Sequence, residues 1–211
     1  MNPEARQRRL RRIPIHPLRG FEDRALSAIS KLRLRYLGVE IGEGVTLLGC
    51  PIAGLERDSK ISIGSRSLLI SRSSRTALGV SSRVVLRTLR PGATIRIGSD
   101  VGISGASICS ARSISLGDRV LVGADVVITD TDFHAVELVP RRYANLPEPK
   151  TGDDVILGDD VFIGARSIVL KGSVIGEGSV IGAGSVVSGE IPPRVVAAGN
   201  PCRVIRRLSS E

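Results

Sequence analysis

A repeat of six residues, an excess of glycine and a shortage of aromatic residues predict an all-β solenoid for this chain of 211 residues. From Leu157 to Pro192, consecutive groups of six begin with Leu, Ile or Val, usually have Gly second, and carry a small or β-branched residue fifth. Such a hexad is one short strand plus a turn, and three hexads close a triangular coil that stacks on the next. The prediction is a hexapeptide-repeat parallel β-helix over residues 39–192.

The composition supports a thin interior filled by branched aliphatic side chains. Aromatic residues make up 2% of the chain and Trp is absent, whereas a conventional core uses aromatic side chains for bulk. The 24 glycines follow no three-residue period, which excludes collagen. An apolar content of 42% excludes long-range disorder.

The same period is present earlier in the chain. It runs from Ile97 through Cys109, slips by one residue at Ser115, and resumes from Leu116 through Ile128. Cys109 then occupies the first position of a hexad, so we expect it to point inward as a small core residue.

The positive charge is concentrated at the N-terminus. Residues 1–37 hold ten Arg and Lys against three Asp and Glu, out of a net charge of +9 for the chain. We expect residues 1–21 to be a solvated basic arm able to make a weak contact with an anionic membrane surface. The arm lacks interleaved aromatic residues and any nucleic-acid motif, so no nucleic-acid partner is predicted.

A helix is predicted over residues 22–38, between the arm and the repeats. Glu22 and Asp23 suit a helix N-terminus, and Gly38 can end the helix. An incomplete apolar stripe is expected to pack against the repeats that follow. The stripe consists of Leu26, Ile29, Leu34 and Leu37.

The three cysteines form no CxxC motif, which argues against a disulfide framework and against a zinc knuckle. This usage is typical of a reducing compartment. The sequence also contains no apolar run of about 18 residues and no signal peptide. These features predict a cytoplasmic location.

The repeat is interrupted between residues 133 and 154 by a polar segment that contains three prolines. A long excursion from a rigid solenoid is a usual place for function. His134 lies at its root, and either Asp130 or Asp132 is placed to orient an imidazole. A neutral histidine there can act as a general base near pH 7.

A C-terminal tail, residues 193–211, follows the solenoid and is rich in arginine. Arg203, Arg206 and Arg207 carry guanidinium groups, which suit the binding of phosphate.

Five motifs carry a resemblance to a known family. They are Thr129–His134 (TDTDFH), Asp160–Ala165 (DVFIGA), Leu170–Gly176 (LKGSVIG), Ile181–Val187 (IGAGSVV) and Ala197–Arg206 (AAGNPCRVIR). In these motifs the sequence resembles the hexapeptide-repeat acyltransferases, in the branch of the maltose, galactoside and nodulation-factor O-acetyltransferases. The resemblance implies a left-handed parallel β-helix and a homotrimer. It also implies direct transfer from acetyl-CoA, bound in the groove between neighbouring subunits, with no metal required.

The resemblance also assigns roles to residues of this chain. His134 would be the catalytic base with Asp132 beside it, and a backbone amide near Ala165 would stabilise the oxyanion. The positions that would contact coenzyme A are Phe162, Ala165, Ala183, Ser188, Arg203 and Arg206. We expect the substrate to be contacted by Asp130, Arg141 and Arg142.

The sequence departs from the family pattern in three places. Ser188-Gly189 stands where relatives often have Thr-Lys, and Ala135 follows the histidine where relatives usually have proline. The coil at Ile103–Ala111 carries only small residues, which argues against a simple galactoside acceptor. The resemblance is closer to enzymes that acetylate surface polysaccharide, lipopolysaccharide or their precursors, so O-acetylation of a sugar or glycan is predicted.

Three other functions compete with this one. The first is N-acetylation of an amino sugar, or acetylation of serine or an antibiotic. The second is a non-catalytic scaffold, in which His134 would be incidental. The third is a zinc β-helix hydratase, which needs three histidine ligands, whereas the whole chain has two histidines.

Overall fold

The computed structural model describes residues 21–137 and 140–209. The predicted basic arm of residues 1–21 therefore lies, apart from Phe21, outside the described residues. Within them, no helix is both long enough and apolar enough to cross a membrane.

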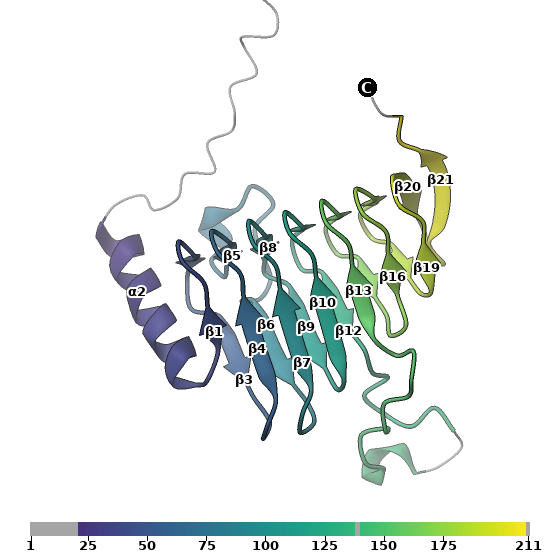
Figure 1. Ribbon diagram of the computed structural model, residues 1–211, viewed down its shortest axis with the longest axis horizontal. Coiled ribbons are helices and arrows are strands. Elements are labelled where there is room, and N and C mark those ends of the chain that lie inside the picture. The colour runs from purple at the N-terminus through teal and green to yellow at the C-terminus, as the bar shows by residue number, and fades with distance from the viewer. Residues whose placement is uncertain (1–20, 138–139, 210–211) are drawn as a thin grey trace, which may run out of the picture.

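The described chain is a solenoid of short strands arranged in three sheets, with one helix at its N-terminal end (Figure 1). Sheet A contains β1 (Glu40–Ile41), β4 (Lys60–Ile63), β7 (Thr94–Ile97), β10 (Ser113–Leu116), β13 (Val155–Leu157), β16 (Val174–Ile175) and β19 (Glu190–Ile191). Sheet B contains β2 (Thr46–Leu48), β5 (Leu68–Ile70), β8 (Gly102–Ser104), β11 (Leu121–Val122), β14 (Phe162–Ile163), β17 (Val180–Ile181), β20 (Val195–Ala198) and β21 (Arg203–Arg207). Sheet C contains β3 (Ile52–Gly54), β6 (Val85–Thr88), β9 (Ser107–Ser110), β12 (Val127–Thr129), β15 (Ile168–Val169) and β18 (Val186–Val187).

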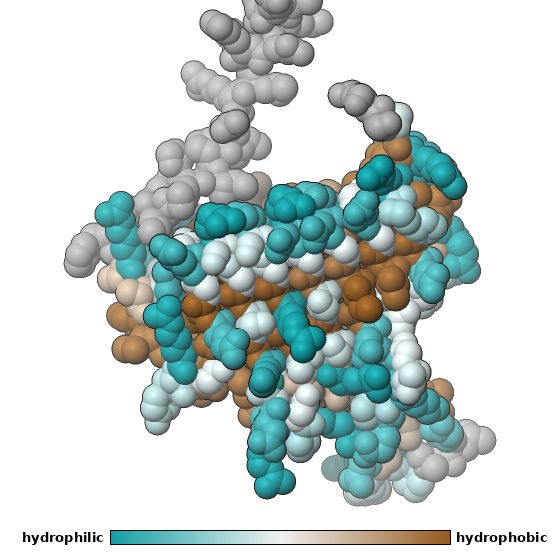
Figure 2. All heavy atoms as spheres, in the orientation of Figure 1, coloured by the Kyte–Doolittle hydropathy of each residue, from teal (hydrophilic) through white to brown (hydrophobic). Residues whose placement is uncertain are grey.

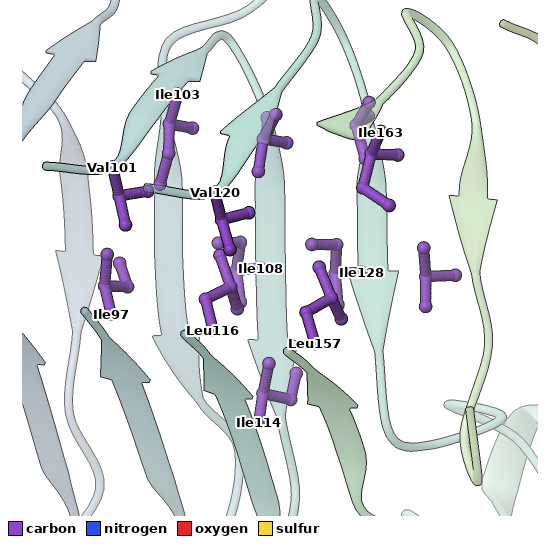
Figure 3. Close-up of a cluster of buried hydrophobic side chains, with 14 of the residues drawn as sticks. Ile97, Val101, Ile103, Ile108, Ile114, Leu116, Val120, Ile128, Leu157 and Ile163 are labelled. Carbon is purple, nitrogen blue, oxygen red and sulfur yellow. The ribbon is translucent and has the colours of Figure 1, made fainter. Parts of the chain in front are cut away.

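The strand register confirms the predicted hexads. Leu157 pairs with Ile175 in sheet A, and Ile163 pairs with Ile181 in sheet B, so one coil takes eighteen residues. Hexad position one is buried in all these hexads, and the side chains fill the interior between the sheets (Figure 3). The left-handed parallel β-helix expected from the sequence is confirmed.

The predicted phase is wrong at Cys109. Ile108 is fully buried, whereas Cys109 is only half-buried and its neighbours in the ladder are Arg87 and Thr129. The step from Ile103 to Ile108 is five residues instead of six, and the step from Ile108 to Leu116 is eight, so the period is broken on both sides of β9. Burial nevertheless raises the pKa of the Cys109 thiol.

The C-terminal segment continues the solenoid before it folds back. Strand β20 extends sheet B in parallel with β17, and β21 then pairs with β20 in the antiparallel direction. The arginines of the tail are thereby fixed on a strand at the end of sheet B.

Helix α2 (Phe21–Tyr36) lies over the first coil and contacts β1 and β2. Of the predicted apolar stripe only Leu34 is buried. Ser27 and Ser30 take the inward positions because they meet backbone groups of the first coil. The Ser27 hydroxyl accepts from the Leu47 amide at 3.1 Å, and the Ser30 hydroxyl lies 3.4 Å from the Gly49 carbonyl.

Candidate active site

The solenoid has three edges where successive turns stack, and two of them carry the predicted site residues. The C–A corner contains the connections from sheet C to sheet A, including the long loop 130–154 that leaves the solenoid between β12 and β13 (Figure 1). The B–C corner contains the turns from sheet B to sheet C, including Gly164–Arg166 and Gly182–Gly184.

Arginine side chains of the solenoid form ion pairs and hydrogen bonds with loop 130–154 at several points. Arg90 pairs with Glu148 at 2.7 Å and also donates to the Leu146 carbonyl. Arg112 pairs with Asp154 at 2.6 Å, next to the start of β13. The loop is therefore anchored to the coil rather than free to swing as a whole.

Asp130 is a structural anchor at the start of the loop. Its side chain is fully buried and accepts hydrogen bonds from the Ser110 hydroxyl and from the backbone amides of Ala111, Arg112 and Ser113. Three of these donors meet Oδ2 and one meets Oδ1, so the carboxylate is held firmly in place. Asp130 also lies in the wall of the cavity described below, and its contact with the substrate stays a prediction.

Asp132 forms an ion pair with Lys171 of the next coil. Its carboxylate lies 2.5 Å from the Lys171 ammonium nitrogen, and both side chains are about one-third exposed. The hydrogen bond and the negative charge of Asp132 raise the pKa of Lys171 above its usual 10.5. The sequence predicted that Asp130 or Asp132 would orient His134, but the structure gives both carboxylates other partners.

His134 is exposed and is placed by the backbone. Its amide donates to the Asp132 carbonyl at 2.7 Å, across Phe133 with a φ of 60°. A hydrogen bond over three residues with positive φ defines a γ-turn, a conformation that costs energy for a bulky residue. The His134 side chain is exposed, so its imidazole is accessible to a ligand.

A cavity of about 300 Å³ opens beside His134. Asp132, two residues before the histidine, and Ala135, directly after it, contribute to the wall, whereas the His134 side chain lies at the margin outside the wall. The other charged residues of the wall are Asp130, Glu137, Glu148, Lys150, Asp153 and Lys171. Acids and amines that alternate around one cavity suit a ligand with many hydroxyl groups.

The two arginines of the loop lie outside this cavity wall. Arg141 donates to the carbonyls of Ala135 and Val136, each at 2.9 Å, and so braces the segment after His134. The guanidinium of Arg142 stands 5.8 Å from the centre of the Tyr143 ring. Both lie in the short 3₁₀-helix η2 (Arg141–Tyr143), and Arg141 acts on the loop rather than on the cavity.

Ala165 and Ala183 lie one coil apart in the B–C corner. A Cβ added to Gly164 would clash with the backbone nitrogen of Ala183, so glycine is required where these turns stack. Within residues 21–137 and 140–209, neither the Ala165 amide nor the Ala183 amide donates a backbone hydrogen bond. The corner therefore presents a narrow row of small side chains and free N–H groups.

Phe162 points outward from β14, next to this corner, and is 42% exposed. Its ladder neighbours Leu121 and Val180 are also on the outer face of sheet B. Arg203 and Arg206 extend from β21 at the end of the same sheet. Both are exposed, and neither has a carboxylate partner in the described part of the chain.

Ser188 lies apart from the other residues that were predicted to contact coenzyme A. It follows β18, so it lies at the C–A corner with Lys171 and the root of loop 130–154. Within one chain, sheet C stands between this corner and the corner of Ala165 and Ala183. The predicted site residues of one chain thus lie on two different edges of the solenoid.

The cations that anchor the loop were not predicted from the sequence. Arg90 and Arg112 follow strands of sheet C, at the same corner as Lys171, but their partners lie far along the chain. The sequence does contain a signal for these ion pairs, because arginines occur in the hexad turns and the loop contains Glu148 and Asp154. That signal becomes visible only once the three-sheet register is known.

Two family models match the repeats. Residues 154–189 match the bacterial transferase hexapeptide of six repeats, and residues 94–130 match the hexapeptide repeat of succinyl-transferase. No curated protein matches the sequence.

Solved structures show the same fold over most of the chain. An acetyltransferase candidate from Bacillus cereus is 26% identical, with a TM-score of 0.51 over 82% of this chain and 76% of that one. A point mutant of AntD, an N-acyltransferase from Bacillus cereus in complex with dTDP-4-amino-4,6-dideoxyglucose and coenzyme A, is 20% identical, with a TM-score of 0.62 over 85% and 90%. A galactoside acetyltransferase in complex with coenzyme A is 23% identical, with a TM-score of 0.56 over 99% and 84%. Residues 94–130 and 154–189 are thus similar to the hexapeptide repeats of bacterial transferases.

Proposed function

We propose that the protein is an acetyl-CoA-dependent O-acetyltransferase that acts on a hydroxyl of a sugar or glycan in surface polysaccharide biosynthesis. The carrying observation is an exposed histidine, His134, beside a polar cavity, on a solenoid with an open row of small residues along another edge. The likeness to a galactoside acetyltransferase with coenzyme A, and to an N-acyltransferase with a nucleotide sugar, supports this donor and this acceptor class.

Acetyl-CoA, the acetyl donor, is a long molecule that would lie along the B–C corner. Its pantetheine arm would follow the small residues Ala165 and Ala183, where no bulky side chain blocks approach to the backbone. Its phosphates would meet Arg203 and Arg206, whose guanidinium groups have no carboxylate partner in the described residues. Phe162 would pack beside the donor.

The acceptor would enter the cavity beside His134. The imidazole takes the proton of the acceptor hydroxyl as its oxygen attacks the carbonyl carbon of the thioester. The resulting oxyanion receives a hydrogen bond from the Ala165 amide. The intermediate then collapses, the carbon–sulfur bond breaks, and the coenzyme A thiolate takes the proton from the imidazolium. The acetyl group passes directly to the acceptor without an acyl-enzyme.

This reaction requires the donor half-site at the B–C corner and the acceptor half-site beside His134 to meet. Because sheet C separates them within one chain, we propose a homotrimer in which His134 of one subunit faces the B–C corner of its neighbour. Ser188 would then contact the donor bound to the neighbouring subunit. Asp132 would act indirectly, by fixing the root of the loop through Lys171.

A second candidate is N-acylation of an amino sugar, which the likeness to AntD favours. Incubation with labelled acetyl-CoA and matched pairs of sugars and amino sugars, free, nucleotide-linked or lipid-linked, would separate the two. An O-acetyl ester is released by mild alkali, whereas an N-acetyl amide survives it. Alkali-labile product made by the native protein and lost in His134→Ala supports the proposal. Alkali-stable product overturns O-transfer, and the absence of both transfer and acetyl-CoA binding favours a scaffold.

A further inference from the structure

Helix α2 turns its apolar side away from the protein. Ile29, Leu32 and Tyr36 are 63%, 71% and 90% exposed, and their spacing places them on one side of the helix. These three residues are called the outward stripe. In Figure 2 apolar residues form the outer edge of the molecule where α2 lies.

The opposite side of α2 is mostly polar. Asp23, Ser27, Ser30 and Leu34 are buried against the solenoid. Asp23 forms an ion pair there with Arg75 at 2.5 Å, and the Ser27 hydroxyl accepts a hydrogen bond from the Leu47 amide. A helix that only caps a coil would bury its apolar residues and expose its serines. The reversed arrangement needs an apolar partner outside the solenoid.

Positive charges flank the outward stripe. Arg24, Lys31 and Arg35 lie along one side of it by helical spacing, and Arg33 lies along the other. Within the described ranges 21–137 and 140–209, none of these four forms an ion pair. The sequence directly before the helix adds six arginines and one glutamate over residues 1–20. An apolar strip bordered by unpaired cations matches the surface of an anionic bilayer.

We propose that α2 docks the protein on an anionic lipid membrane, with the outward stripe inserted at the interface and the basic flanks over the lipid phosphates. A second copy of the chain fits less well. Two helices packed through this stripe would bring Arg24, Lys31 and Arg35 close to the same cations of the partner. Nucleic acid would leave the apolar stripe without a partner.

Membrane docking would place the N-terminal end of the solenoid against the lipid. In an assembly of solenoids that run side by side in one direction, each copy would present its stripe at the same end, which multiplies the affinity. Docking is separate from acetyl transfer, because α2 contacts β1, β2 and the Arg72–Arg75 turn after β5, whereas His134 and Arg203 lie far along the solenoid. Vesicle binding therefore tests this proposal whatever the reaction is.

The test is co-sedimentation of the full chain with vesicles of phosphatidylcholine alone or of an equimolar mixture with phosphatidylglycerol. The native protein should bind the mixed vesicles, and the binding should weaken as salt is raised. The double variant Ile29→Ser, Leu32→Ser should bind at least about tenfold more weakly, since it loses most of the inserted apolar surface. The variant Arg24→Gln, Lys31→Gln, Arg35→Gln should weaken binding to mixed vesicles and flatten its salt dependence.

The matched control is Ile205→Ser, which removes a similarly exposed apolar side chain, 65% exposed, from β21 at the opposite end of the solenoid (Figure 1). It should bind as the native protein does, and circular dichroism should show the helix intact in every variant. Binding that survives loss of the stripe would assign it to the basic arm alone and overturn the proposal. No binding by the native protein would also overturn it. A change in oligomeric state on sedimentation, without a change in vesicle binding, would overturn it too and identify the stripe as a contact between copies.

Discussion

The ammonium of Lys171 lies 2.5 Å from a carboxylate oxygen of Asp132, and this ion pair joins the root of loop 130–154 to the next coil of the solenoid. The pair forms part of the wall of the cavity beside His134. It thereby connects a rigid repeat to the segment that carries the proposed base.

Replacement of Lys171 by Met should weaken acceptor binding. The loop root loses its link and the cavity loses a cation, so the Michaelis constant for the acceptor should rise severalfold while that for acetyl-CoA stays nearly unchanged. Because both partners are about one-third exposed, the free energy of unfolding should fall by only about 0.2–1 kcal/mol. Steady-state kinetics and denaturant titration measure the two effects, with Lys60→Met, at an exposed lysine, as the control.

The pH dependence of this ion pair follows from the raised pKa of Lys171. A raised folded-state pKa means that the stabilisation is complete below the unfolded value near 10.5 and is lost as the pH rises through the folded value. The difference in stability between native protein and Lys171→Met should therefore be constant near neutrality and vanish only in strong alkali. A difference that disappears below about pH 9 would show that some other group is responsible.

His134→Ala should lower the turnover rate by about 10²- to 10⁴-fold, the usual contribution of a general base. Affinity for coenzyme A should barely change, because the base meets the acceptor and not the nucleotide. Turnover and calorimetric binding are the measurements. His16→Ala, at the other histidine of the sequence, is the control and should leave both unchanged. Turnover within a factor of a few of the native rate would remove His134 from the mechanism.

Arg203→Ala should raise the Michaelis constant for acetyl-CoA roughly ten- to a hundredfold, the effect of losing a charge-assisted contact. The constant for the acceptor should stay nearly the same. Arg194→Ala is a matched control, because that guanidinium is paired with Glu177 at 3.0 Å on another corner. An unchanged acetyl-CoA constant in Arg203→Ala would place the donor elsewhere.

A lysine at position 189, suggested by the relatives' Thr-Lys, is not expected to compensate for this loss. Gly189 has a φ of 84°, a backbone conformation that strains any residue with a side chain. The missing lysine thus reflects the local backbone of this chain. Ser188→Lys, at the exposed neighbour without a positive φ, is the better way to add a cation at that corner.

The repeat was predictable because its rules are local. Each hexad places its first residue inward by the geometry of one strand and one turn, so the interior from Leu157 to Val187 followed directly from the sequence. The error at Cys109 came from a turn that is one residue short, which a fixed period does not reveal. The fold and the hexapeptide repeats were thus confirmed, while the phase was wrong in one place.

The site was less predictable because its contacts join segments that the repeat separates. Asp130 and Asp132 were equivalent in the sequence, yet one is saturated by amides of the preceding coil and the other is paired with Lys171 of the following coil. The predicted apolar stripe of α2, Leu26, Ile29, Leu34 and Leu37, was expected to face inward because apolar residues usually do, but only Leu34 is buried. Instead, Ser27 and Ser30 form hydrogen bonds with backbone groups of the first coil. The helix therefore turns these serines, and not its apolar residues, toward the solenoid.

The division of the site between two corners predicts complementation between inactive subunits. His134→Ala removes the acceptor half, and Ala183→Trp should block the donor half, since Ala183 is exposed on the B–C corner and can accept a large side chain without entering the core. Each variant alone should be inactive. In a closed ring of three that contains both variants, one interface in three joins the two intact halves, so roughly a third of the native activity should return.

Mixing is achieved by co-expression with two different tags and purification through both. A mixture that remains as inactive as either parent would place both halves of the site within one chain, and a fully active monomer on sedimentation would exclude the trimer. Co-expression of each variant with the native chain is the control, because it shows that the mixed assemblies form and retain native sites. Recovered activity in the doubly tagged fraction can come only from sites formed between subunits, because no single chain in that fraction carries both halves.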